Sequence, residues 1–138
     1  MCDDAWTLKE IGDFIYLLDC HAPDKNDVLQ RRFKKDQDSF KILFDMLSQF
    51  DSLGFDGAMK FGQQTGRIRG IRNNKHLTLI EIRVGKTLWR VITYVSYEKK
   101  ALVMIDAFEH HKKKTMNKVV EECTDRIRRA SKLIREVE

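Results

Sequence analysis

Apolar and polar residues change their spacing along the chain, and the first clear pattern is that of a short strand. Residues 14–19 form an apolar run, with Gly12 and Asp13 before it and Pro23, the single proline of the chain, soon after it. A run of this length between turn-forming residues is typical of a buried or half-buried strand. We therefore expect a first strand at residues 14–19.

A helical spacing follows between residue 27 and about residue 50. The apolar positions recur every three or four residues, at Val28, Leu29, Phe33, Phe40, Leu43, Phe44, Leu47 and Phe50. This spacing places them on one stripe and predicts either one long helix or two helices with a kink between Phe33 and Phe40. Asp24 or Asn26 is expected to cap the start, and Gly54 follows the end.

Residues 55–76 break the apolar pattern and predict a basic connector. Glycines and cations share this stretch, as Gly57, Gly62, Gly66, Gly70, Arg67, Arg69, Arg72 and Lys75. Glycine at this density is typical of an irregular or partly helical segment rather than of a core element.

Three strands are predicted next. Alternation in residues 77–84 puts Ile80, Ile82 and Val84 on one face, and Leu79, Glu81 and Arg83 on the other. Residues 88–97 and 101–108 follow after short turns, and short connections imply antiparallel neighbours. The dense apolar run at residues 101–108 is typical of a central strand.

The last predicted element is a helix from Met116 to about Val137, with Thr115 at the position of an N-cap. Its apolar positions recur at helical spacing, at Met116, Val119, Val120, Cys123, Ile127, Ala130, Ile134 and Val137. The opposite face is predicted to be cationic and carries Arg126, Arg128, Arg129, Lys132 and Arg135.

Together these elements predict an α+β fold for a single domain over residues 1–138. The sheet is expected to be small and antiparallel, with about four strands, packed against a long N-terminal helix or helical hairpin and followed by a C-terminal helix. A length of 138 residues suits one domain, and 42% hydrophobic residues supply enough apolar side chains for a core.

Charge is distributed unevenly and points to a polyanionic partner. Residues 1–56 carry 7 Lys and Arg against 12 Asp and Glu, whereas residues 57–138 carry 19 against 9. A segment with a net charge of +10 is a plausible surface for nucleic acid, because each cation that neutralises a phosphate also releases counterions. The alternative is an ordinary solvated surface.

Other residue classes narrow the expectations further. Cys2, Cys20 and Cys123 are far apart and form no metal-binding or redox pair, so we expect reduced thiols, no metal and no cofactor. No apolar run approaches the roughly 20 residues that span a bilayer, and the start of the chain lacks the features of a secretory signal. The expected location is the cytoplasm, without a membrane partner.

Residues 79–115 read LIEIRVGKTLWRVITYVSYEKKALVMIDAFEHHKKKT and lead into NKVVEECTDRIRRA at residues 117–130. The stretch resembles the RelE/ParE toxin superfamily, and it looks most similar to the HigB-like, phage-derived group. That group has a strand ending in Leu or Ile and Arg, a glycine turn, an aromatic-Arg strand, an apolar strand ending in Phe, a Lys-Lys-Thr box and a helix. The matching positions here include Ile82-Arg83, Gly85, Trp89-Arg90, Phe108 and Lys113-Lys114-Thr115.

This resemblance implies a metal-independent endoribonuclease that cuts messenger RNA, often in the ribosome, and inhibits translation as the toxin of a toxin–antitoxin system. It also implies a partner antitoxin that binds DNA through a helix-turn-helix. Cleavage of this kind uses the 2′-hydroxyl of the substrate as nucleophile, so the protein supplies a proton acceptor, a proton donor and cations for the phosphorane.

Four residues are the catalytic candidates. Arg83 and Arg90 occupy the strand arginine positions of the family, where rigid guanidinium groups can hold a phosphate. The alternative is that they pair with Glu81 or Asp106 and only hold the sheet together. His110 and His111 follow the last strand beside a lysine run, and one of them is a candidate acid or base. The predicted RNA-binding residues are Arg67, Arg69, Arg72, Lys112, Lys113, Lys114 and Arg128.

The chain departs from the family in one respect. Some RelE-like nucleases carry lysines on the first of these three strands and a tyrosine in the final helix, whereas this chain has Leu79 and Glu81 on that strand and no tyrosine in that helix. Their proton relay therefore does not transfer residue by residue. Two other functions stay open: a non-nucleolytic ParE-like toxin that binds a topoisomerase, and an inert phage-derived RNA-binding domain.

Overall fold

A computed structural model describes residues 6–20, 27–71, 78–111 and 115–137. The strands are β1 (Trp6–Glu10), β2 (Ile15–Cys20), β3 (Ile68–Gly70), β4 (Leu79–Arg83), β5 (Trp89–Ser96) and β6 (Ala101–Glu109). The helices are α1 (Val28–Arg32), α2 (Gln37–Gln64), α3 (Met116–Glu122) and α4 (Thr124–Arg135). Within these ranges no helix is both long and apolar enough to cross a bilayer.

The strands form one mixed sheet with the order β1-β2-β6-β5-β4-β3. All neighbours are antiparallel except β2 and β6, which pair in parallel. The predicted α+β class is confirmed, but the expected antiparallel sheet of about four strands is wrong, since the described residues form six. Two short edge strands were missed: β1, which alternates Trp6 and Leu8 with polar residues, and the three-residue β3.

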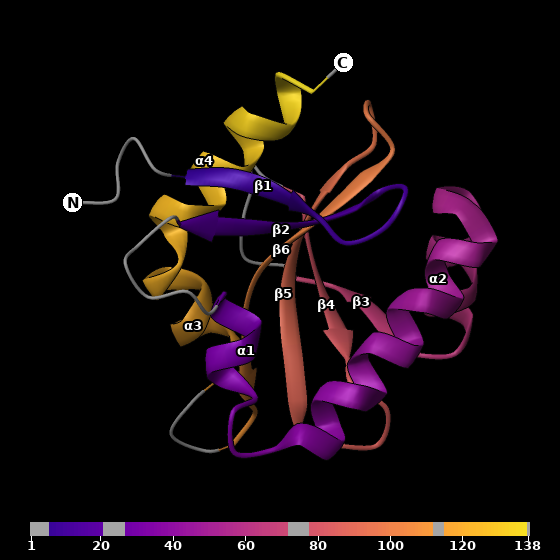
Figure 1. Ribbon diagram of the computed structural model, residues 1–138, viewed down its shortest axis with the longest axis vertical. Helices are drawn as coiled ribbons and strands as arrows, with labels where there is room; N and C mark the ends of the chain where they lie inside the picture. The colour runs from indigo at the N-terminus through magenta and orange to yellow at the C-terminus, as the bar shows by residue number, and fades with distance from the viewer. Residues whose placement is uncertain (1–5, 21–26, 72–77, 112–114, 138) are drawn as a thin grey trace.

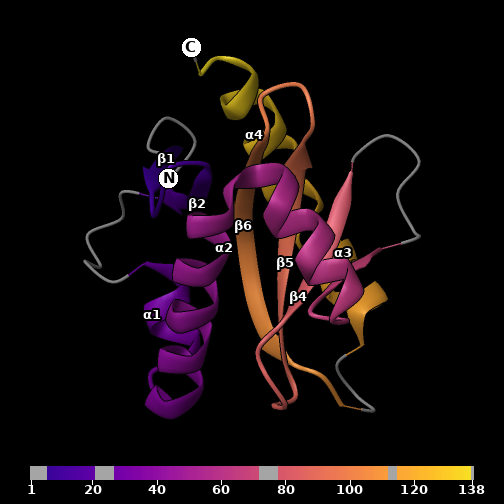
Figure 2. The ribbon, with the colours of Figure 1, turned by 90° about the vertical axis from the view of Figure 1, so that its right-hand side faces the viewer.

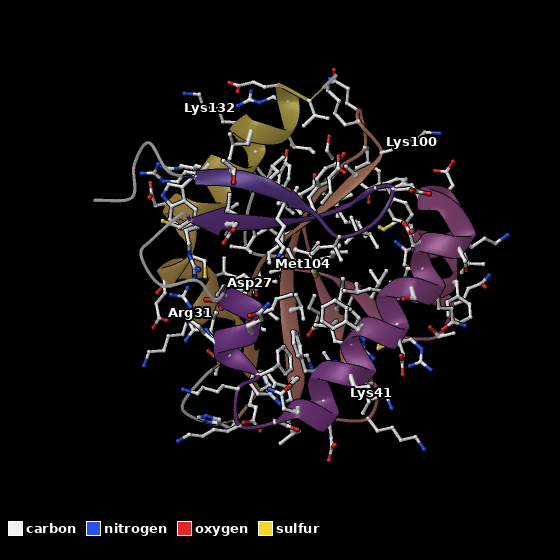
Figure 3. The ribbon with its side chains drawn as sticks, viewed as in Figure 1. Asp27, Arg31, Lys41, Lys100, Met104 and Lys132 are labelled. Atoms are coloured by element: carbon white, nitrogen blue, oxygen red, sulfur yellow. The ribbon has the colours of Figure 1, made fainter. Side chains whose placement is uncertain are left out.

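Helices cover both faces of the sheet, as Figures 1 and 2 show: α2 lies on one side, and α3 and α4 lie on the other. Met104 is fully buried on the α2 side and lies near the centre of the molecule in Figure 3. Ile92 and Ile127 belong to the apolar cluster under α3 and α4. Strand β2 pairs with β6 only along residues 102–104 of β6. Helix α1 also packs against β6.

The N-terminal helical pattern forms two helices, which is one of the two predicted alternatives. Asp27 caps α1 by accepting from the backbone N–H of Gln30, and Asp36 caps α2 by accepting from that of Ser39. The cap of α1 is therefore Asp27, whereas the expected candidates Asp24 and Asn26 lie outside the described residues.

Helix α2 continues well beyond the predicted end near residue 50. At Gly54 the backbone leaves helical geometry, with φ 75° and ψ 169°, and the chain resumes its helix after this kink. The second half lies in the stretch predicted as an irregular or partly helical connector: part of it is indeed helical, but the expectation that it lies outside the core is wrong, because Phe55, Ala58 and Met59 are buried in the same apolar cluster as the strands. Their spacing is helical, but glycines and polar residues between them hide the stripe.

Gly62 lies where α2 passes closest to the sheet. A Cβ atom added there would lie 2.3 Å from Cδ1 and 2.5 Å from Cγ1 of Ile68 on β3. We expect Gly62→Ala to lower the free energy of unfolding by about 1–3 kcal/mol, because overpacking outweighs the better helix propensity of alanine. Urea denaturation measures this change. Gly57→Ala, at a half-buried position of α2 where an added Cβ would lie 3.2 Å from Cβ of Leu53, is the control and is expected to have a smaller effect; equal effects at the two positions would contradict the close approach at Gly62.

The final helical pattern is broken at Cys123 into α3 and α4. Thr115 caps α3 as predicted, by accepting from the backbone N–H of Lys118 at 3.4 Å. The central predicted apolar positions are buried: Val119, Val120, Cys123, Ile127, Ala130 and Ile134. Arg126 does not belong to a purely solvated cationic face as predicted, because its guanidinium group turns to the buried Asp106.

Candidate nucleic-acid interface

Strand pairing sets three arginines side by side. Arg83 on β4 is the register partner of Arg90 on β5, and Arg90 in turn lies opposite Phe108 on β6. The backbone N–H of Arg83 donates to the carbonyl oxygen of Arg67 at 2.7 Å, at the start of β3. The row across the sheet is thus Phe108, Arg90, Arg83 and Arg67.

A second row lies one step along the strands. Arg69 on β3 pairs with Glu81 on β4, which pairs with Ile92 on β5. Side chains two residues apart on a strand share a face, so Glu81 and Arg83 are neighbours, as are Arg67 and Arg69. We call the surface formed by Arg67, Arg69, Arg83 and Arg90 the arginine face.

The arginine face exists because apolar alternation takes the other side of the same strands. Ile68, Ile82 and Val91 are buried in the cluster packed under α2. Their neighbours Arg67, Arg69, Arg83 and Arg90 must therefore point to the opposite side of the sheet. On that side α3 and α4 pack over Ile92 and Phe108, which flank the arginines.

One carboxylate serves this face within the described residues. Glu81 lies 3.4 Å from Nε of Arg90 and 3.8 Å from Nη2 of Arg83. These pairs match one of the alternatives raised from the sequence, in which the strand arginines pair with Glu81. Four guanidinium groups against one carboxylate leave the face with an excess of three positive charges, so pairing within the sheet accounts for only part of its charge.

Arg90 is the most constrained of the four. Its side chain is 12% exposed, and its Nη1 donates to the carbonyl oxygens of Thr87 and Trp89, each at 2.9 Å. Burial lowers the pKa of Arg90, and the charges of Arg83 and Arg69 lower it further against the opposing effect of Glu81. An arginine remains charged at neutral pH even so. The group is a fixed cation held among like charges.

His110 lies at the end of the arginine row. It follows β6, and its backbone N–H donates to the carbonyl oxygen of Leu88 at 2.8 Å. Its ring centroid lies 6.4 Å from that of Phe108, so the imidazole is beside the aromatic end of the row. His110 and His111 are both exposed. The predicted RNA-binding residues Arg72, Lys112, Lys113 and Lys114 lie outside the described residues.

Arg128 is exposed on α4, on the flank nearer the arginine face. The side-chain hydroxyl of Ser131 donates to the hydroxyl of Tyr94 at 3.3 Å, and Tyr94 pairs with β4. Residues three apart lie on the same side of a helix, so Arg128 shares the flank of Ser131. Arg129 lies on the other flank, where its guanidinium group is 5.6 Å from the ring centre of Trp6 on β1.

Tyr94 and Glu81, two other side chains able to exchange protons near the arginine face, are engaged by neighbours. The hydroxyl of Tyr94 is bonded to Ser131, and Glu81 is shared between two arginines. Tyr97 is exposed, but it lies beyond the far end of β5 and packs edge-on against Phe55. The aromatic side chains of Trp89 and Phe108 are buried and pack in the core.

Asp106 is a buried aspartate on β6, and it pairs with Arg32 and Arg126 rather than with the strand arginines suggested from the sequence. Its side chain is 4% exposed and accepts two hydrogen bonds from Arg32 on α1, at 2.8 and 3.0 Å, and another from Arg126 on α4. Burial alone would raise the pKa of Asp106, but the hydrogen bond from Arg32 and the charge of Arg126 outweigh it and hold the pKa below its usual value. A lone acid within the apolar run of residues 101–108 was the available signal.

Cys123 completes this buried cluster. Its thiol sulfur accepts from Nη2 of Arg126 at 3.1 Å, and burial raises its pKa, so the thiol stays protonated at neutral pH. Neither Cys20 nor Cys123 takes part in a disulfide. The cluster joins α1, β6 and α4 through Asp106, and we assign it a structural role, the stabilisation of the fold.

A cationic hollow of about 390 Å³ lies at the end of α1. It is lined by Arg31, Arg32, Lys34, Lys35, Asp36, Trp89 and Glu109. Two carboxylates offset its charge, Arg32 is bonded to Asp106, and Asp36 accepts from the indole N–H of Trp89 at 2.9 Å. These contacts engage or offset part of its positive charge.

The described residues contain no group of three or more His, Cys, Asp or Glu side chains arranged to hold a metal ion. Comparisons of the chain with protein-family models, with curated proteins and with solved structures found no match.

Proposed function

We propose that this chain is a toxin of the RelE/HigB kind, an endoribonuclease that cuts messenger RNA at the ribosome and thereby inhibits translation. The observation that carries the proposal is the arginine face, where four guanidinium groups and one carboxylate lie on adjacent strands. The expected regulatory partner is an antitoxin that covers this face. The antitoxin is expected to bind DNA through a helix-turn-helix.

In the proposed reaction the 2′-hydroxyl of a ribose attacks the adjacent phosphorus. The bond to the 5′-oxygen breaks, and the products are a 2′,3′-cyclic phosphate and a free 5′-hydroxyl. Arg90 and Arg83 stabilise the extra negative charge of the phosphorane, because rigid guanidinium forks bind two phosphate oxygens from fixed positions. His110, at the end of the row, accepts the proton of the 2′-hydroxyl or donates one to the leaving 5′-oxygen, and solvent water exchanges the other proton.

The test is the chemistry of the RNA ends after the protein is added to a translating extract. We expect primer extension to map new ends within messenger RNA, and we expect those ends to carry a 5′-hydroxyl and a 2′,3′-cyclic phosphate. A transcript with a 2′-deoxy nucleotide at the mapped position should stay whole. Products with a 5′-phosphate, or cleavage of the deoxy-substituted transcript, would contradict this reaction.

Two alternatives make different predictions for the double variant Arg90→Gln, His110→Gln. The ribonuclease loses both cleavage and growth arrest. A ParE-like toxin that binds a topoisomerase keeps its growth arrest and shows signs of DNA damage. An inert RNA-binding domain differs already in the wild-type protein, which then causes neither cleavage nor growth arrest. Such a domain still binds RNA, with an affinity that falls steeply as the salt concentration rises.

A further inference from the structure

A hollow of about 340 Å³ opens beside the arginine face. It lies between the turn after α2 and the turn that joins β4 to β5, and it is lined by Thr65, Gly66, Arg67, Arg69, Arg83, Gly85 and Lys86. Gly66 and Gly85 have positive φ values, 73° and 56°, which glycine adopts without strain and which let the two turns bend here. The lining contains four cations and no carboxylate among the described residues.

Two of these cations have buried donors without an acceptor. Nε of Arg67 and Nε of Arg83 are buried and make no hydrogen bond within the described part of the chain. Buried polar atoms in folded proteins nearly always have a partner, and an ion or a ligand is one accepted reason for an exception. Both atoms belong to residues that line the same hollow, so one anion there can supply acceptors to each.

The hollow is distinct from the position of Arg90. Arg67 and Arg90 lie on either side of Arg83, and neighbouring strands are about 4.8 Å apart, so their backbones are separated by about 10 Å. Arg90 does not line the hollow. The surface from Arg90 to the hollow is therefore wide enough for two anionic groups, with Arg83 between them.

We propose that this hollow binds a second phosphate of the RNA chain, next to the phosphate that is cleaved. The inference rests on the proposed function for the identity of the first phosphate. Arg67 and Arg83 supply buried donors, and Lys86 supplies an exposed charge at the rim. This subsite sets the position of the RNA along the sheet, so it contributes to binding rather than to the chemical step.

The experiment measures binding of a fluorescein-labelled 2′-O-methyl octauridylate, which lacks the attacking hydroxyl and cannot be cut. Fluorescence anisotropy titrations at several KCl concentrations give the affinity and its salt dependence. We expect Lys86→Gln and Arg67→Gln each to weaken binding several-fold and to reduce the slope of log K against log salt by about one. Lys86 is exposed, so its variant is expected to fold normally.

Lys100→Gln is the matched control because it removes the same charge at the opposite end of β5, at the tip of the β5–β6 hairpin (Figure 3). Slopes for the Lys86 and Arg67 variants that equal the slope of wild type, or that fall no more than in the Lys100 variant, would overturn the subsite. RNA cleavage by the same proteins is scored separately. Failure of wild type to cut RNA would refute the proposed reaction, while the binding result would still decide the subsite.

Discussion

Arg90→Gln is expected to lower the rate constant of RNA cleavage by about 10²–10³-fold, the usual effect of removing one donor that stabilises an oxyanion. Arg90 is fixed by the carbonyl oxygens of Thr87 and Trp89, so it meets the phosphorane without first having to be ordered. Single-turnover cleavage of a defined messenger RNA on ribosomes measures the effect, with the affinity for the 2′-O-methyl octauridylate measured beside it.

Two further variants show whether the effect of Arg90→Gln comes from the geometry of the guanidinium group or from the loss of a charge. Arg90→Lys keeps the charge but loses the planar fork, and we expect it to recover only a small part of the rate. Arg128→Gln removes a charge from the neighbouring flank of α4 and is expected to change cleavage by less than about tenfold, because its exposed position away from Arg90 suits RNA binding rather than the chemical step. An Arg90→Gln protein that is folded and cuts RNA at the wild-type rate would exclude Arg90 from catalysis.

Asp106→Asn is expected to lower the free energy of unfolding by about 1–3 kcal/mol, the usual cost of leaving buried donors without their acceptor, because Arg32 and Arg126 keep partial access to solvent. The substitution leaves the guanidinium groups of Arg32 and Arg126 without their shared carboxylate. Urea denaturation at neutral pH measures the loss. Asp125→Asn is the control, since this 78% exposed carboxylate pairs with Arg129 in an i,i+4 contact and contributes less than about 1 kcal/mol.

The same substitution has a pH signature. Because the folded state lowers the pKa of Asp106, its stabilising contribution is complete above the unfolded value near about 3.9 and is lost as the pH falls through the lower, folded value. The difference in stability between wild type and Asp106→Asn should therefore be constant above about pH 5 and shrink below about pH 4. A difference that grows on acidification would contradict the assignment.

Much of the arginine face could be predicted from the sequence. Alternation in β4 placed Arg83 and Glu81 opposite the core residues Ile80 and Ile82, and the structure confirms both faces. The short turn before β5 implied an antiparallel neighbour, which brings Arg90 beside Arg83. Period-two patterns and short turns act over a few residues, so they can be interpreted without knowing the rest of the fold.

The parts that were missed depend on distant segments. Strand β3 has three residues, too few for an alternating pattern, so the position of Arg67 and Arg69 beside Glu81 was not predictable. The partner of Asp106 on α1 is Arg32, which is 74 residues away in the chain. The parallel pairing of β2 with β6 is equally distant, and no local spacing encodes it.

That parallel pairing also decides when the N-terminal part of the molecule can be completed during synthesis. Ile15 and Leu102 are partners, so β2 has no strand on its second edge until 87 further residues have been made. At about 5–20 residues per second the wait on the translating ribosome is about 4–17 s. Throughout that interval the edge of β2 that later pairs with β6 has unpaired backbone N–H and C=O groups. The nascent chain is then open to attack by proteases and to strand pairing with other chains.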